Sequence, residues 1–285
     1  MKKLNLVAIV ALAFGLSATL TSCSNEGTVG TDAQVMTTAS DESQAATVSD
    51  GVISEADQYV TVAANNGYMA AKSMVETVAT TPTVTISSND STLFPKTITI
   101  DFGTTGFTGK RGNVLTGKLI VVISEKMWKV GSTKTITYDN FTVNGNKVAG
   151  SKVITNNGVN AAKEPSQSVV VKDSITRVDG ALVTWNSTRT RTRISNGGTP
   201  LDPTDDEFSI TGGSNGVNAK GVAYTMAISA NNPLIAYNNY PHFVQGTVTM
   251  TTEKRSALMD YGDGTKDNLA TVTINGVTKT ITLKK

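Results

Sequence analysis

The chain has almost none of the residues that cross-link a fold or carry the commonest catalytic chemistry. Its 285 residues include one cysteine and one histidine. A single cysteine excludes an intrachain disulfide, so packing alone holds the fold. A lone histidine, His242, cannot form the usual relay with a nucleophile, and no Gly-x-Ser-x-Gly, His-Glu-x-x-His or phosphate-binding motif is present. These absences argue against an enzyme and leave only carboxylates from separate strands as a catalytic alternative.

Long hydrophobic runs are also scarce. The apolar run 4–16 is shorter than the roughly 20 residues of a membrane-spanning helix. It follows Lys2 and Lys3 and precedes small polar residues, which is the order of a secretory signal peptide. Removal of residues 1–22 would take away both lysines and lower the formal net charge from +2 to 0. A neutral chain lacks the basic footprint of nucleic-acid-binding proteins, so we expect no nucleic-acid partner.

The end of this segment, Leu20-Thr21-Ser22-Cys23, resembles the bacterial lipobox. The resemblance implies that Cys23 receives acyl chains such as palmitate and becomes the first residue of the mature protein. Buried acyl methylenes then replace a spanning helix as the membrane anchor. We therefore expect an exported lipoprotein of the outer membrane, on either the periplasmic face or the cell surface, with no cofactor.

Four regions follow one another along the chain. Residues 1–22 form the signal peptide, and residues 23–50, rich in Ser, Thr, Asp and Gln, predict a flexible tether. Residues 51–80 predict a short helical segment with Ser54 as its N-cap, interrupted at Asn65-Asn66-Gly67 and stopped by Pro82. Residues 81–285 predict an antiparallel β domain.

Alternation of Thr, Val and Ile with polar residues, broken by frequent Gly turns, gives that β prediction. The expected fold class is mainly β, a long curved antiparallel meander or half-barrel, with a β-sandwich as the alternative. Asn144-Gly145 and Asn275-Gly276 predict two-residue hairpin turns. The expected strands are 97–101, 118–124, 134–143, 152–155, 168–173, 181–185, 189–194, 207–211, 221–229, 243–251, 270–274 and 279–283.

Three stretches together resemble a group of uncharacterised outer-membrane lipoproteins of Bacteroidota. They are residues 98–103 (ITIDFG), residues 117–121 (GKLIV), and the C-terminal pattern DYGDG with DN and ATVTINGVTKTITL from residue 260 onward. The resemblance implies lineage and no mechanism. Members commonly carry cysteines near two positions where this chain has Phe107 and Lys266, so a disulfide, metal or redox site there is not implied for this chain.

Arg189, Arg191 and Arg193 alternate with threonines and therefore share one face of a strand, with neighbours about 6.8 Å apart. Such a ladder could bind an anionic polymer, since planar guanidinium groups match carboxylates and phosphates. The alternative is a solvated strand face whose arginines pair with carboxylates of a neighbouring strand.

Two weaker motifs suggest a metal and a modification. Asp260, Asp263 and Asp267 crowd oxygen ligands into one loop, which is what calcium requires, although a glycine-rich hairpin loop explains the same residues. Ser91 and Ser174 each follow aspartate in a sequence that resembles the O-glycosylation sequon of this bacterial group. Ordinary strand-edge hydroxyls are the alternative there.

The sequence thus favours a non-catalytic binding or structural lipoprotein that presents a β surface to glycan, an envelope protein or an apolar ligand. The alternative is a glycan-active hydrolase that draws its carboxylates from separate strands. A carrier of acylated molecules is a third hypothesis, and it predicts a dry apolar concavity.

Overall fold

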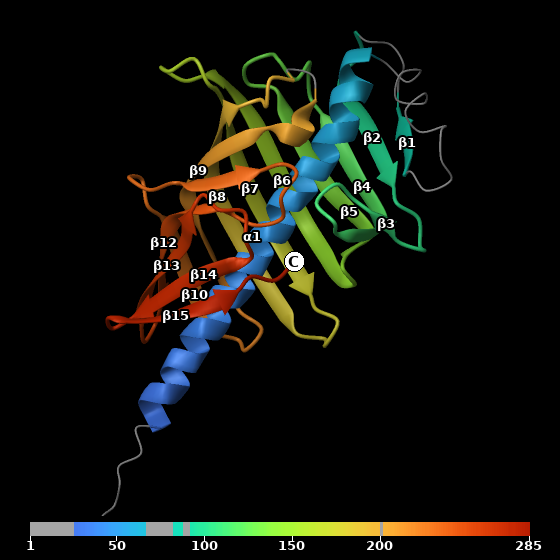
Figure 1. Ribbon diagram of the computed structural model, residues 1–285. Coiled ribbons are helices and arrows are strands. Elements are labelled where there is room, and N and C mark those ends of the chain that lie inside the picture. The colour runs from blue at the N-terminus through green and yellow to red at the C-terminus, as the bar shows by residue number, and fades with distance from the viewer. Residues whose placement is uncertain (1–25, 67–81, 88–91, 200–201) are drawn as a thin grey trace, which may run out of the picture.

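The computed structural model describes residues 26–66, 82–87, 92–199 and 202–285. These residues form one long helix, α1 (Glu26–Asn66), and one antiparallel sheet that curves around it (Figure 1). A single 3-10 turn, η1 (Pro203–Asp205), lies between two strands. Within these residues, no helix has the length and apolar character needed to cross a membrane.

The sheet follows the chain almost strand by strand. Its order is β1-β2-β4-β5-β6-β7-β8-β9-β10-β12-β13-β14-β15, while β3 pairs with β4, and β11 lies beside β9 and β12. The strands are β1 (Thr83–Ile86), β2 (Lys96–Asp101), β3 (Phe107–Thr108), β4 (Val114–Ile123), β5 (Thr133–Val143), β6 (Asn146–Val159), β7 (Pro165–Thr176), β8 (Leu182–Ser195), β9 (Glu207–Val217), β10 (Ala223–Ile228), β11 (Leu234–Tyr237), β12 (Gln245–Thr252), β13 (Ser256–Asp263), β14 (Leu269–Ile274) and β15 (Val277–Thr282).

This architecture confirms the predicted fold class, a mainly β chain with a long curved antiparallel meander. The two predicted hairpin turns are also confirmed. Val143 pairs with Asn146 and Ile274 with Val277, and the Asn-Gly residues between them have φ values of 50° and 79° in the first turn and 51° and 80° in the second. Positive φ at both positions is what a two-residue turn matching the strand twist requires. The predicted strands 181–185 and 189–194 are one continuous strand, β8.

The N-terminal part of the described chain differs from the sequence expectation. Residues 26–50, predicted as part of a flexible tether, form the first half of α1, so the helix is 41 residues long rather than a short segment within 51–80. The remainder of that segment, residues 67–80, lies outside the described residues, and so does Gly67 of the predicted interruption.

The physical reason lies in the surroundings of α1. Between Asp41 and Ala56 every side chain is buried except Gln44, which is half-buried. The helix therefore has no solvent-facing side along this stretch and needs no apolar stripe, which is the pattern by which surface helices are recognised. Its polar composition, which predicted a tether, is matched by polar groups of the enclosing sheet.

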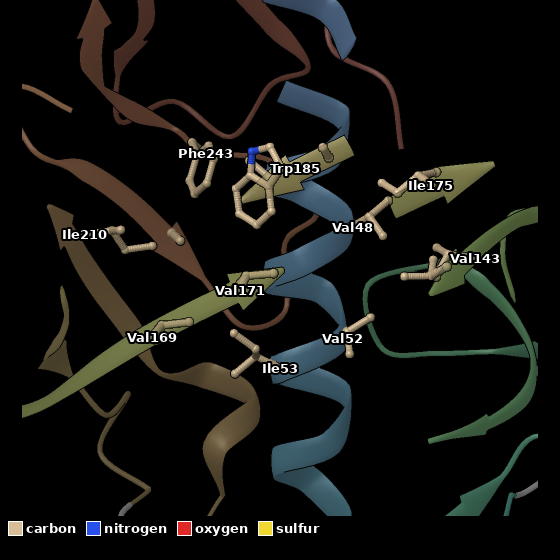
Figure 2. Close-up of a cluster of buried hydrophobic side chains, with 14 of the residues drawn as sticks. Val48, Val52, Ile53, Val143, Val169, Val171, Ile175, Trp185, Ile210 and Phe243 are labelled. Atoms are coloured by element: carbon tan, nitrogen blue, oxygen red, sulfur yellow. The ribbon is translucent and has the colours of Figure 1, made fainter. Parts of the chain in front are cut away.

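An apolar core surrounds the middle of α1 (Figure 2). Val48 and Val52 point toward Val143 of β5, while Ile53 points to the other side, toward Val169 and Val171 of β7. All six side chains are at most 4% exposed. Contacts to several strands at once fix both the position and the rotation of the helix.

Val48 lies in the region predicted as tether, so its truncation tests the docked helix. We expect Val48→Ala to lower the free energy of unfolding by about 2 kcal/mol, because it removes a buried side chain and leaves a cavity. Gln34→Ala on the exposed part of the same helix is the matched control and should change little. Urea unfolding measures both, and equal stabilities of the two variants would contradict the docked arrangement.

Candidate functional site

The three arginines of β8 do share one face of the strand, as the sequence predicts, and that face is the concave one. Arg189 and Arg191 are 5% and 4% exposed, whereas the side chain of Arg193 is 31% exposed. The threonines between them face outward. The structure thus places the first two arginines inside the molecule rather than on a solvated face.

Their charge partners come mainly from α1. Arg189 lies 3.5 Å from Oδ2 of Asp50 and 3.8 Å from Oε1 of Glu42, and Arg191 lies 3.7 Å from Oδ2 of Asp57. Arg191 also donates a hydrogen bond of 2.5 Å to Oδ1 of Asn238. Of the two predictions for these arginines, pairing with carboxylates is therefore closer to the observed geometry than an open anion-binding ladder. The carboxylates that pair with Arg189 and Arg191 belong to the helix α1, however, and not to a neighbouring strand.

Aromatic rings complete the surroundings of these two arginines. The guanidinium of Arg189 lies 4.8 Å from the ring centre of Trp185, and that of Arg191 lies 3.4 Å from the ring centre of Phe208. Trp185 Nε1 in turn donates to Glu42 at 3.4 Å. A guanidinium over an aromatic face gains electrostatic attraction even after losing water, so the cations are held in the interior from two sides.

Further basic side chains of the concave face repeat this pattern. Lys134 forms an ion pair with Asp57 of α1, and Arg177 forms one of 2.8 Å with Asp41. Lys152 donates at 2.8 Å to Ser49 of α1 and also forms an ion pair with Asp173 of β7. We call this whole set of α1 carboxylates and concave-face cations the inner charge network.

Burial shifts the pKa values within the network. It raises the pKa of Glu42, an effect that the nearby Arg189 opposes, and it lowers the pKa of Arg191, an effect that Asp57 opposes. It also raises the pKa of Asp173 despite the ion pair with Lys152. Each ionised group therefore depends on its partner, because a buried charge without one is strongly unfavourable.

Glu55, the last residue but one of the enclosed stretch, has a different kind of environment. The turn before β4 closes over it so tightly that a Cβ added to Gly109 would lie 2.6 Å from Oε2 of Glu55. The adjoining cavity is only about 10 Å³, roughly the space of one water molecule. The hydroxyl of Tyr59 donates a hydrogen bond of 3.3 Å to the carboxyl group of Glu55, which by itself lowers the pKa of Glu55. Burial outweighs this effect and raises the pKa of Glu55 to about 7.

His242 is buried as well, at 3% exposure. Burial, with the nearby cations Arg111 and Lys285, lowers the pKa of its imidazole to about 4. Within the described chain its Nδ1 has no hydrogen-bond partner. The ring is thus neutral near pH 7.

The residues predicted as calcium ligands lie at or near the end of β13. Each carboxylate accepts a hydrogen bond from a nearby backbone N–H: Asp260 from Gly262 at 2.9 Å, Asp263 from Thr265 at 3.1 Å, and Asp267 from Leu269 at 3.0 Å. The described part of the chain contains no group of three His, Cys, Asp or Glu side chains placed to hold a metal ion. Calcium at this turn stays a prediction from the sequence.

The other predicted residues fall in three places. Ser174 lies near the C-terminal end of β7 on the convex face, half-buried, while the preceding Asp173 points inward. Ser91 and Cys23 lie outside the described residues. Arg193 pairs with Asp206 at 3.5 Å near the rim, where burial raises the pKa of that aspartate to about 6.

The acidic half of the site was not predicted from the sequence; it consists of Asp41, Glu42, Asp50, Glu55 and Asp57. A signal was available, since Asp50 and Asp57 are seven residues apart and so lie on the same face of any helix. Chemically the assembled groups can hold a polar helix in a polar groove. Their charges already have partners, and the groups are enclosed from solvent.

We expect Arg189→Gln to destabilise the chain by about 3 kcal/mol, because it leaves buried carboxylates without their cation. Asp50→Asn should also destabilise it, and the double variant should lose less than the sum of the two single losses. Lys172→Gln on the convex face is the matched control. Denaturant unfolding of all four variants gives the coupling energy, and strictly additive effects would mean that Arg189 and Asp50 do not interact.

Glu55 gives a pH dependence with a defined sign. Its pKa is 4.5 ordinarily and about 7 in the fold, so the folded state binds the proton more tightly. Its stabilising contribution is complete below pH 4.5 and is lost as the pH rises through 7. Glu55→Gln, which mimics the protonated form, should therefore be more stable than the parent at pH 8 by roughly 3 kcal/mol. At pH 4.5 the two should be similar, and a constant difference between these pH values would contradict the shift.

Comparison with known proteins gives no relative from which a function could be taken. No protein-family model, curated protein or solved structure matches the chain. The interpretation of the inner charge network therefore rests on the contacts of its own residues.

Proposed function

We propose that this chain is a lipid-anchored, non-catalytic binding or structural protein of the bacterial outer membrane. The observation that carries the proposal is the filling of the concave face by α1. An open half-barrel usually offers its concavity to a ligand, and here that space holds the chain's own helix, which is buried along residues 41–56 apart from the half-buried Gln44. Contact with a partner is left to the convex face, the turns and the sheet edges.

The convex face has the chemistry of a polar binding surface. On β8 it presents Thr184, Asn186, Thr188, Thr190 and Thr192, which alternate with the inward residues. A shallow hollow of about 710 Å³ crosses this face between β7 and β9, where Gly213 leaves room and Lys172 adds a positive charge. Hydroxyl and amide groups on a rigid sheet suit the hydroxyl groups of a glycan or the polar surface of an envelope protein.

Anchoring is supported by the sequence that ends at Cys23 and by the likeness to uncharacterised Bacteroidota lipoproteins. Both features are compatible with a position on the periplasmic face and with one on the cell surface.

The hydrolase alternative requires a pair of accessible carboxylates. The carboxylates that the fold gathers most densely, Glu42, Asp50 and Asp57, are instead engaged with buried cations.

The anchoring part is tested by Cys23→Ala in the full chain expressed in a bacterial host. We expect the parent to incorporate labelled palmitate and to sediment with membranes, and the variant to do neither. Ser24→Ala, which leaves Cys23 intact, should behave like the parent. Label in the Cys23→Ala variant would contradict lipid attachment at this residue, and release of sugars from envelope glycans by the purified parent would favour the hydrolase alternative instead.

A further inference from the structure

α1 enters the sheet at one defined end. Its first described side-chain contacts are Asp32 with Arg255 at 3.8 Å, Thr38 with Asn218 at 2.8 Å, and Asp41 with Arg177 at 2.8 Å. These partners lie in turns at the same end of the strands. We call this the anchor end, formed by the turns 144–145, 177–181, 218–222, 253–255 and 275–276. In Figure 1 the N-terminal part of α1 projects past the sheet at this end.

The chain length before α1 places Cys23 close to this end. Cys23 precedes the first helical residue, Glu26, by three residues, which span at most about 11 Å. The six helical steps from Glu26 to Asp32 add about 9 Å. An acyl chain on Cys23 therefore starts within about 20 Å of the anchor end, whereas a flexible tether over 23–50 would allow several times that distance.

The anchor end is also the basic end of the sheet. From β4 onward, the opposite ends of the strands are joined by the turns 124–132, 160–164, 196–206, 238–244 and 264–268, which we call the far end. Counting these turns and three residues on either side, the anchor end of the sheet has six basic residues and two acidic ones, and the far end has six basic and eight acidic. The basic residues of the anchor end are Lys147, Arg177, Lys220, Lys254, Arg255 and Lys279, and its acidic residues are Asp179 and Glu253. The basic residues of the far end are Lys126, Lys129, Lys134, Lys163, Arg193 and Lys266. Its acidic residues are Glu125, Glu164, Asp202, Asp205, Asp206, Glu207, Asp263 and Asp267. The count leaves out α1, whose Asp32 and Asp41 pair with Arg255 and Arg177, so the four lysines are the basic residues of the anchor end that remain for lipid phosphates.

Exposed apolar side chains accompany these charges. Val178 is 77% exposed and Val277 is 60% exposed, each in or beside a turn of the anchor end, and Leu182 is 54% exposed at the start of β8. A hollow of about 360 Å³ opens between α1 and the turns 218–222 and 253–255, with Val35 and Lys254 among its lining residues. Apolar tips flanked by lysines suit the interface between lipid headgroups and acyl chains.

From these observations we infer that the anchor end lies directly against the lipid bilayer, with Val178 and Val277 at the headgroup level and the lysines near lipid phosphates. The inference rests on the proposed lipid anchor at Cys23 and goes beyond it, because an anchored domain could equally swing free of the membrane. It sets the orientation of the whole sheet, with the far-end turns, among them the one that carries Trp128, on the side away from the membrane.

Two exposed valines at opposite ends offer a matched test. In a Trp128→Phe background, which keeps only the buried Trp185, a single reporter is introduced as Val178→Trp at the anchor end or as Val159→Trp at the far end, where Val159 is 64% exposed. The lipidated full chain is reconstituted into vesicles of phosphatidylethanolamine and phosphatidylglycerol with brominated acyl chains. We expect the emission of Val178→Trp to be about twofold lower in brominated than in unbrominated vesicles, because a side chain at the membrane interface lies close to the brominated acyl chains. The emission of Val159→Trp should be the same in both kinds of vesicle.

Val277→Trp is a second reporter at the anchor end in case Val178→Trp disturbs its turn, and it should be quenched as well. Lys220→Glu with Lys254→Glu should weaken the quenching, whereas Lys126→Glu with Lys163→Glu at the far end should not. Equal quenching at the two ends, or stronger quenching of Val159→Trp, would overturn the inference. Failure of the parent to float with vesicles would instead overturn the proposed anchor, so the two failures are distinguishable.

Discussion

The fold depends on one constraint, the burial of a charged helix against a charged sheet face. Neither partner is satisfied alone. Without the sheet, α1 would be a helix in which Thr, Val, Ser, Asp and Gly, residues with modest or low helix propensity, outnumber the alanines, and helices of such composition are unstable in water when isolated. Without α1, Arg189 and Arg191 would lose their carboxylates in an apolar setting. Helix and sheet therefore stabilise each other and form one folding unit.

This constraint determines where a ligand can bind. The arginine spacing that predicts a site for an anionic polymer is present. The anionic groups next to Arg189 and Arg191, however, are carboxylates of the chain's own helix, α1. An external polyanion would have to displace Asp50 and Asp57 together with the apolar contacts of Val48, Val52 and Ile53. A carrier of acyl chains would need a dry apolar concavity. In this fold α1 fills the concavity of the sheet, and ion pairs lie between the helix and the sheet. Binding by the convex face or the turns requires no such rearrangement.

The sequence predicted the sheet well and the helix poorly, for a physical reason. Alternation and turn chemistry are local, so Asn144-Gly145 and Asn275-Gly276 were sufficient to place two hairpins. The tether prediction assumed that a segment with few large apolar residues cannot offset its ordering entropy. That assumption fails for α1, because buried ion pairs and small side chains replace an apolar stripe. The alternation likewise showed that the arginines share a face, but whether that face is inside depends on Asp50, 139 residues away.

The same long separations order the events of folding. Side-chain hydrogen bonds of α1 join residues as far apart as Asp57 and Lys134, which are 77 positions apart, and Gln44 and Lys285, which are 241 positions apart. Hairpins such as β5–β6 and β14–β15 close short loops and can form early, whereas each α1 contact requires a long loop to close. The helix is the first element synthesised, yet its full set of partners exists only when the C-terminal strands are present. A polar composition fits this delay, because an exposed α1 without partners carries few apolar residues that could aggregate while the sheet assembles around it.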